Sequence, residues 1–261
     1  MTRRTRGPKA ILWGAGALAG VVLLLTGYAA LTGGDAPDPT GQGGGRPTVS
    51  AAPSRPAPTY TRPEDWTEPT RWAALPRGAR TDARRNEIGF PHTTEGAMAM
   101  LAAYTTSSMD GSRSLVDDQV ATYQSYVAAA DQSPANDRKV QQTAARAQKS
   151  MLDQLGAGDG GLPSGAYVRV TAVGYKIIGS SRDQVSAYLL SRVVTKAGET
   201  QGEQASYTRT VAGAIWESGD WRVSTAATLS AIRQEGEKPA IVAPGDADFN
   251  GAGWTAIRAA S

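Results

Sequence analysis

Cysteine is absent from this chain of 261 residues, and histidine occurs once, as His92. The lack of cysteine excludes disulfide bonds, a lipid anchor on an N-terminal cysteine, thiol catalysis and cysteine-ligated zinc. A single histidine forms a metal site only where several carboxylates converge on it, and the nearest acidic residue in the sequence is Glu95. We therefore expect no metal and no cofactor, and a folded part that is held together by its own apolar core.

Acidic residues are absent from the start of the chain, where basic residues gather. The chain has 27 basic and 24 acidic residues, and four of the basic ones precede a long apolar segment. Removing these four leaves 23 basic and 24 acidic residues, a net charge of −1 for the rest of the chain. A nearly neutral domain lacks the electrostatic footprint of a protein that binds a phosphate backbone. We therefore expect no nucleic-acid partner.

The apolar segment has no charge between Lys9 and Asp35 and contains the run AILWGAGALAGVVLLLTGYAAL. The predicted transmembrane helix begins at Ala10 and ends at Leu31. Such a helix rises about 33 Å, enough to cross a hydrocarbon core about 30 Å thick. The basic residues before it predict a cytoplasmic N-terminus and an extracellular C-terminal domain in the cell membrane. The alternative is a cleaved signal peptide, whose apolar region is typically about 7–15 residues long.

A segment rich in Gly, Pro, Ser, Thr and Ala follows over residues 32–63. Such a segment cannot bury enough apolar surface to offset the entropy of ordering, so it predicts a disordered linker. A linker of this kind holds a folded domain some tens of Å from the bilayer. Residues 64–90, which include Trp66 and Trp72, are transitional. They either pack onto the domain or remain loose.

Three helical patterns begin the outer domain. The first starts near Thr93 or Thr94, either of which can cap the helix. The second covers residues 114–129, with an apolar stripe at Val116, Val120, Tyr123 and Val127. The third opens with Ser133 and Pro134 and ends before Gly156. Its predicted apolar face consists of Val140, Ala144, Ala147, Met151 and Leu155.

Four segments rich in β-branched and aromatic residues follow a glycine-rich loop. They cover residues 166–179, 184–196, 203–216 and 221–227. Because the links between them are short, we expect antiparallel neighbours. The prediction is an α+β domain over residues 91–230, with about three helices packed on one face of a four-stranded antiparallel sheet. Residues 231–261 are expected to be mostly irregular, with 240–242 as a candidate for a short extra strand.

This order of anchor, linker, helices and sheet resembles a known architecture, the nuclear-transport-factor-2-like cone fold. Within that fold it is similar to bitopic assembly factors of type IV secretion and Gram-positive conjugation machines. The segment GFPHTTEGA, residues 89–97, also resembles a motif of uncharacterised actinobacterial membrane proteins that has no assigned chemistry. The resemblance covers residues 86–230. It departs from the conjugation factors in one respect, because those often carry two such domains and this chain has room for one.

Five residues are candidates for a pocket or a partner surface. His92 is either a general base, as in the pocket His–Asp pair of some cone-fold enzymes, or a turn residue before a helix cap. Arg169 and Arg209 either enter the mouth of the cone or stand on its solvent face. Trp216 and Trp221 bracket the last hairpin and serve either in packing or in partner binding. No residue is assigned a catalytic role.

These features predict a membrane-anchored extracytoplasmic scaffold or interaction protein and not an enzyme. The resemblance implies a component of a conjugation or secretion complex whose partners are envelope proteins or copies of the chain itself. The alternative is a small-ligand-binding or enzymatic cone-fold domain that uses a pocket near His92.

Overall fold

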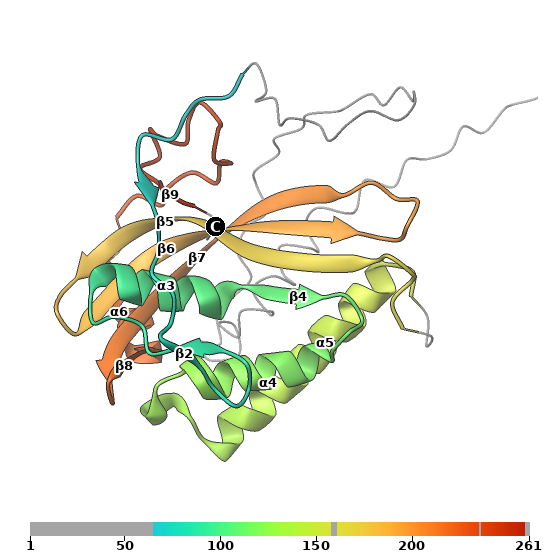
Figure 1. Ribbon diagram of the computed structural model, residues 1–261, viewed down its shortest axis with the longest axis horizontal. Coiled ribbons are helices and arrows are strands. Elements are labelled where there is room, and N and C mark those ends of the chain that lie inside the picture. The colour runs from blue at the N-terminus through green and yellow to red at the C-terminus, as the bar shows by residue number, and fades with distance from the viewer. Residues whose placement is uncertain (1–64, 158–160, 235, 259–261) are drawn as a thin grey trace, which may run out of the picture.

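The computed structural model describes residues 65–157, 161–234 and 236–258. The predicted transmembrane helix and linker lie outside these residues. In the described part, no helix combines the length and the apolar character needed to cross a bilayer. The described residues form an α+β fold with four α-helices and a mixed sheet, which confirms the predicted class (Figure 1).

A seven-stranded sheet lies at the centre, in the order β1-β9-β5-β6-β7-β8, with β4 paired to β5. All of its pairs are antiparallel except β1 with β9. The predicted antiparallel meander is confirmed as β5 to β8, since short turns join these strands. The prediction of a sheet with four strands, all antiparallel, was wrong, because β1, β4 and β9 add to it and β1 pairs in parallel. The strands of this sheet are β1 (Trp72–Ala73), β4 (Ser107–Met109), β5 (Tyr167–Ser180), β6 (Gln184–Lys196), β7 (Gln204–Glu217), β8 (Asp220–Val223) and β9 (Thr255–Ile257). A separate hairpin joins β2 (Arg80–Thr81) to β3 (Glu87–Ile88).

Each of the three predicted helices begins at the predicted position, and each has a side-chain cap. The Thr93 hydroxyl accepts from the Gly96 N–H at 3.0 Å, and the Ser133 hydroxyl accepts from the Asn136 N–H at 3.2 Å. Ser114 caps the second helix in the same way. The helices are α3 (Thr94–Thr105), α4 (Leu115–Tyr126) and α5 (Pro134–Gln154), and a short 3-10 turn covers Ala129–Asp131. The predicted inner face of α5 is buried at Val140, Ala144, Ala147 and Met151.

Two predicted element ends were wrong, each for its own reason. Helix α4 stops at Tyr126 and not at residue 129, because Val127 forms a bridge with Val223 and the Ala128 N–H donates to the Val223 carbonyl at 2.9 Å. Strand β8 likewise stops at Val223 and not at residue 227. The Ser224 hydroxyl accepts from the Ala227 N–H at 3.3 Å and opens a fourth helix, α6 (Thr225–Gln234), that was not predicted.

The two faces of the sheet are covered by different parts of the chain. The helical face is lined by odd-numbered residues of β6 and packs against α3, α4 and α5. The opposite face, which we call the C-terminal face, is lined by Tyr188 and Leu190 and packs against residues near the C-terminus. A Cβ added at Gly213, opposite Ser186, would lie 2.8 Å from the Ala227 Cβ of α6. Helix α6 therefore packs on the C-terminal face, and the prediction of helices on one face was wrong, since both faces are apolar and need cover.

The segments on either side of the predicted domain also belong to the fold. The Thr67 N–H donates to the Gly245 carbonyl at 2.7 Å, and the Trp66 ring fills the space beside Gly245. Phe249 and Trp254 are fully buried on the C-terminal face. Residues 240–242 are not a strand, contrary to prediction, and the short strand of this region is β9. Residues 65–90 are therefore packed and not loose, and the described fold extends beyond residues 91–230.

Candidate functional site

The segment 89–97 is joined to the β7–β8 hairpin through one buried carboxylate. Asp220 is 3% exposed and accepts from the N–H groups of Gly89 at 2.7 Å and Phe90 at 3.0 Å. It also accepts from the Trp221 N–H at 2.9 Å. Gly89 has a φ of +77°, a conformation that favours glycine, and this turn directs both N–H groups at the carboxylate. The first glycine of the GFPHTTEGA segment is thus explained by its backbone geometry.

The next contact is made by the Pro91 carbonyl, which accepts from two donors. These are the Trp221 Nε1–H and the Thr93 N–H, each at 2.8 Å. The same carbonyl lies so close to α3 that a Cβ added at Gly96 would be 1.9 Å from its oxygen. The second glycine of the segment is therefore required by close packing of backbone on backbone.

Replacing Gly96 with alanine is expected to lower the free energy of unfolding by about 1–3 kcal/mol, the usual cost of an overpacked site. An alanine inside a helix is normally favoured over glycine by about 1 kcal/mol, so the expected sign is the reverse of the helix propensity. Urea unfolding of the full chain in mild detergent measures the change. Gly202→Ala is the control, because no atom lies within 4 Å of the added Cβ. Equal stability of the two variants would contradict the close approach.

His92 lies at the centre of an aromatic cluster. Its ring stacks on Trp216 with centroids 4.0 Å apart and an interplanar angle of 7°. The Trp221 ring meets His92 edge to face with centroids 5.6 Å apart, and it meets Trp216 in the same way with centroids 5.4 Å apart. The Nε2 atom of His92 is 2.8 Å from Oδ1 of Asp183, yet Nε2 makes no hydrogen bond of acceptable geometry. The two atoms are therefore close together without forming an aligned hydrogen bond.

The structure brings together three of the five candidate residues and separates two. His92, Trp216 and Trp221 form the cluster just described. Arg169 and Arg209 lie on the C-terminal face, opposite Val194 and Leu190, so neither enters the helical face. The Arg169 guanidinium lies 4.2 Å from the centre of the Tyr167 ring, and Arg209 donates to the Pro239 carbonyl.

Two acidic residues of the cluster were missed by sequence reasoning. Asp183 lies in the turn before β6, and Asp220 is the first residue of β8 after a turn, where acidic residues are common for reasons of turn geometry alone. Their role depends on which segment packs against each turn. His92 and Asp183 are about 90 residues apart in the sequence, and Phe90 and Asp220 are 130 residues apart. No local pattern in the sequence predicts such contacts.

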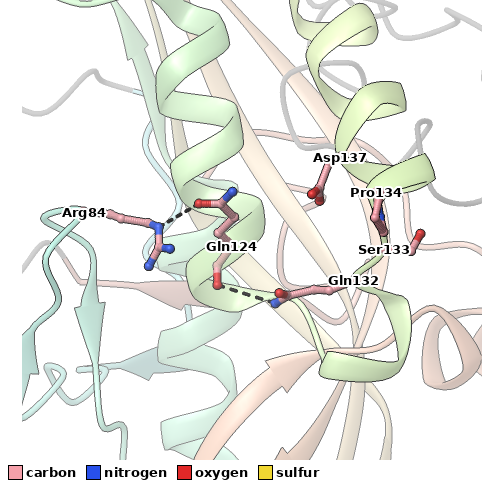
Figure 2. A pocket seen from close by; sticks show the side chains of 6 residues that line it. All are labelled: Arg84, Gln124, Gln132, Ser133, Pro134 and Asp137. Carbon is pink, nitrogen blue, oxygen red and sulfur yellow. Dashed lines mark hydrogen bonds between the residues drawn. The ribbon is translucent and has the colours of Figure 1, made fainter.

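Two polar clefts lie away from the aromatic cluster, on either side of Arg84. The first has a volume of about 360 Å³, and Figure 2 shows Arg84 and Gln124 facing Asp137 across it. Arg84 Nε donates to Gln124 Oε1 at 2.8 Å. The second, of about 380 Å³, includes Asp110, whose pKa is held below its ordinary value by hydrogen bonds from the hydroxyl and N–H of Ser112. Neither cleft includes a residue of the aromatic cluster.

The hairpin that carries Arg84 is held to α4 through Asp82. One carboxylate oxygen accepts from the Ser125 hydroxyl at 2.6 Å, and the other accepts from the N–H groups of Arg84 and Asn86 at 2.8 and 2.9 Å. Burial by itself would raise the pKa of Asp82, but these hydrogen bonds outweigh it and hold the pKa below its ordinary value of 3.8. The interaction therefore favours the ionised carboxylate.

A carboxyl group with a depressed folded-state pKa stabilises the fold above its unfolded pKa, and this contribution is lost as the pH falls through the folded value. We expect Asp82→Asn to lower the free energy of unfolding at pH 7. The difference from the unchanged chain should shrink as the pH falls from about 5 to below the ordinary aspartate pKa of about 3.9. Urea unfolding at a series of pH values measures it, and a difference that stays constant with pH would refute the assignment.

Comparison with known proteins finds no matching family model, no matching curated protein and no matching solved structure. Among the described residues, no group of three or more His, Asp or Glu side chains is placed to hold a metal ion. The function proposed below therefore rests on the residues and their contacts, and the family resemblance stays a prediction.

Proposed function

We propose that this chain is a membrane-anchored extracytoplasmic scaffold or interaction protein that belongs to a conjugation or secretion complex. The apolar segment and its basic flank support the anchor and its orientation. The nearly neutral charge of the remaining chain and its linker support a domain that is presented to protein partners. On this proposal the domain is of the nuclear-transport-factor-2-like type.

The main observation in support of the proposal is that the two ends of the described chain lie close together. Its first described residues pack against its last ones: Trp66 lies on Gly245, and the Asn250 side chain accepts from the Thr70 N–H at 2.9 Å. Strands β1 and β9 then pair in parallel. Both ends of the described chain thus lie at one margin of the sheet (Figure 1). A tether attached at one margin leaves α4, α5 and the β6–β7 hairpin available for contact with partners.

Affinity purification of the tagged full chain from detergent-solubilised membranes tests the proposal. The same tag on residues 1–64 alone is the control, since that piece keeps the predicted anchor and linker. We expect a reproducible set of envelope proteins, or a second copy of the chain, with the full chain only. Repeated recovery of the full chain as a lone monomer would overturn the scaffold function.

The orientation is tested with introduced cysteines, because the chain has none of its own. A membrane-impermeant maleimide applied to intact cells is expected to label Ser50→Cys and to leave Thr5→Cys unlabelled until the membrane is opened. Labelling of Thr5→Cys from outside would contradict the orientation. A mature chain that lacks position 5 would contradict the anchor and support a cleaved signal.

A second candidate function is a small-ligand or enzymatic site at His92, favoured by its 2.8 Å approach to Asp183. The side chains of His92 and Asp183 are 26% and 65% exposed, although the Nε2 atom of His92 is itself buried. Trp216 stacks on His92 and reports any ligand through its fluorescence. A ligand that changes this fluorescence in the full chain, and fails to do so in His92→Gln, would support this function. A fragment library without any such ligand would count against it.

A further inference from the structure

Strand β7 has a long open edge. It covers Gln204–Glu217, and β8 pairs only with the part from Ala214 onward. Residues 204–213 pair with β6 on one side, and no other strand of the described residues pairs with them on the other. Figure 1 shows this part of β7 along the upper margin of the sheet, at the right of the view, next to the projecting β6–β7 hairpin.

This edge lacks several of the features that normally protect an edge strand from pairing with another chain, although it carries one inward-pointing charge, Arg209, on the C-terminal face. Edges are usually blocked by proline, by lysine, by a bulge or by a covering segment. The sequence QASYTRTVAG of residues 204–213 contains no proline and no lysine, and Arg209 is its only charged residue. The pairing of β7 with β6 runs without a register shift from Gln204 to Ile215, so no bulge bends the edge away.

We propose that residues 204–212 pair antiparallel with the same residues of a second copy of the chain, about a two-fold axis through Thr208. The two sheets become continuous across the junction. This inference rests on the proposed scaffold function and names one partner of it, the chain itself.

An unsatisfied hydroxyl marks the centre of this pairing. Thr208 is 7% exposed, and its Oγ1 is buried without a hydrogen-bond partner among the described residues. Buried polar atoms without partners are uncommon and call for an explanation. A two-fold axis through Thr208 places the same residue of the second copy directly opposite, on the same face of the joined sheet. Opposed hydroxyl residues form cross-strand hydrogen bonds, so Thr208 of the second copy offers a partner after a rotation about χ1, as does Ser191, whose unpartnered hydroxyl lies opposite Thr208 on β6.

The residues around the centre are complementary to themselves. Tyr207 lies opposite Arg192 and Arg209 lies opposite Leu190, so both side chains lie on the C-terminal face. An axis through Thr208 sets Tyr207 of each copy opposite Arg209 of the other, twice by symmetry. The chain already makes this kind of contact, with Arg169 at 4.2 Å and Arg209 at 5.9 Å from tyrosine ring centres. An axis through Arg209 would oppose two like charges, so the central position is selected by charge.

A second copy fits this edge better than a strand of another protein, for two reasons. The Tyr207–Arg209 complementarity is between residues of the same sequence and requires no residue of another protein. Copies that share the proposed membrane anchor also meet at high effective concentration, which favours weak pairing of identical edges.

Disulfide trapping of the full chain in its membrane tests the pairing. Opposed residues in an antiparallel pair have Cα atoms about 4.5–5.5 Å apart, within the range for a disulfide. Because the unchanged chain has no cysteine, the thiol introduced by Thr208→Cys can form a disulfide within this protein only with the same position of a second copy. We expect mild oxidation to convert it to a disulfide-linked dimer. The control Thr171→Cys, exposed on the interior strand β5, should remain monomeric. Equal dimer yields from the two variants would overturn the pairing.

A charge test in the dimer follows from the same register. In the proposed dimer, Tyr207→Arg places a positive charge of each copy opposite Arg209 of the other copy. This repulsion is expected to raise the dissociation constant of the dimer about 10-fold or more. Adding Arg209→Glu restores opposite charges and should restore association. Tyr167→Arg is the matched control, because Tyr167 is half-buried on β5, away from the edge. Circular dichroism checks that each variant is folded. Unchanged association of Tyr207→Arg would refute the register.

The two proposals fail in distinguishable ways. One outcome is a disulfide at residue 208 with no envelope protein in the affinity purification. It would support the self-pairing and contradict membership of a larger complex. Recovery of envelope proteins with a Thr208→Cys variant that never joins its own copy would overturn the self-pairing alone. A disulfide between Thr208→Cys and a different protein would assign the edge to that protein and also overturn it.

Discussion

Replacing Trp221 with alanine is expected to lower the free energy of unfolding by about 3–5 kcal/mol, the usual cost of deleting a buried aromatic side chain. Trp221 is 1% exposed, and it contacts both His92 and Trp216. Its Nε1–H also donates to the Pro91 carbonyl at 2.8 Å. The substitution therefore removes apolar contact area and a hydrogen bond at once, at the junction between the 89–97 segment and the β7–β8 hairpin.

Urea unfolding of the full chain in mild detergent, followed by near-ultraviolet circular dichroism, measures this loss. Trp221→Phe keeps most of the ring area and removes the donor, so it should fall between the alanine variant and the unchanged chain. Trp72→Ala is a further control, because Trp72 is only partly buried, at the other side of the sheet. A loss for Trp221→Ala no larger than that for Trp72→Ala would show that the junction does not stabilise the fold.

Replacing Asp220 with alanine is expected to cost about 3–5 kcal/mol by a different mechanism. The carboxylate accepts from the N–H groups of Gly89, Phe90 and Trp221, and all three donors would lose their acceptor. Each buried donor left without a partner costs about 1–3 kcal/mol. The loss of the carboxylate should also free the 89–97 segment, so hydrogen exchange at residues 89 and 90 should accelerate.

Asp220→Asn separates the two contributions, because its side chain keeps one acceptor oxygen and fills the same space. It should cost less than Asp220→Ala. Asp248→Ala, at an exposed position, should stay within about 0.5 kcal/mol of the unchanged chain. Rapid exchange at residues 89 and 90 in the unchanged chain would contradict the role of Asp220 as the acceptor that fixes this segment.

Local patterns in the sequence predicted much of the fold. Threonine or serine before an amphipathic run marks the start of each of α3, α4 and α5, because the cap hydrogen bond forms within four residues. The alternating faces of β6 and the short links around it predicted the antiparallel centre of the sheet for the same local reason. Where the prediction failed, a distant contact decided the outcome. Val127 bridges to the distant Val223, which ends α4 at Tyr126.

For the candidate site, too, some conclusions follow from the sequence and others need the tertiary structure. The sequence by itself determined that there is no thiol chemistry, that the basic excess precedes the apolar segment, and that His92, Trp216 and Trp221 deserve inspection. Composition and local order are sufficient for those conclusions. Only the tertiary structure decided that these three rings contact one another, that Asp183 and Asp220 complete the cluster, and that Arg169 and Arg209 lie on the other face. Those outcomes depend on strand register and on which turn meets which segment, and both are set by packing between residues far apart in the chain.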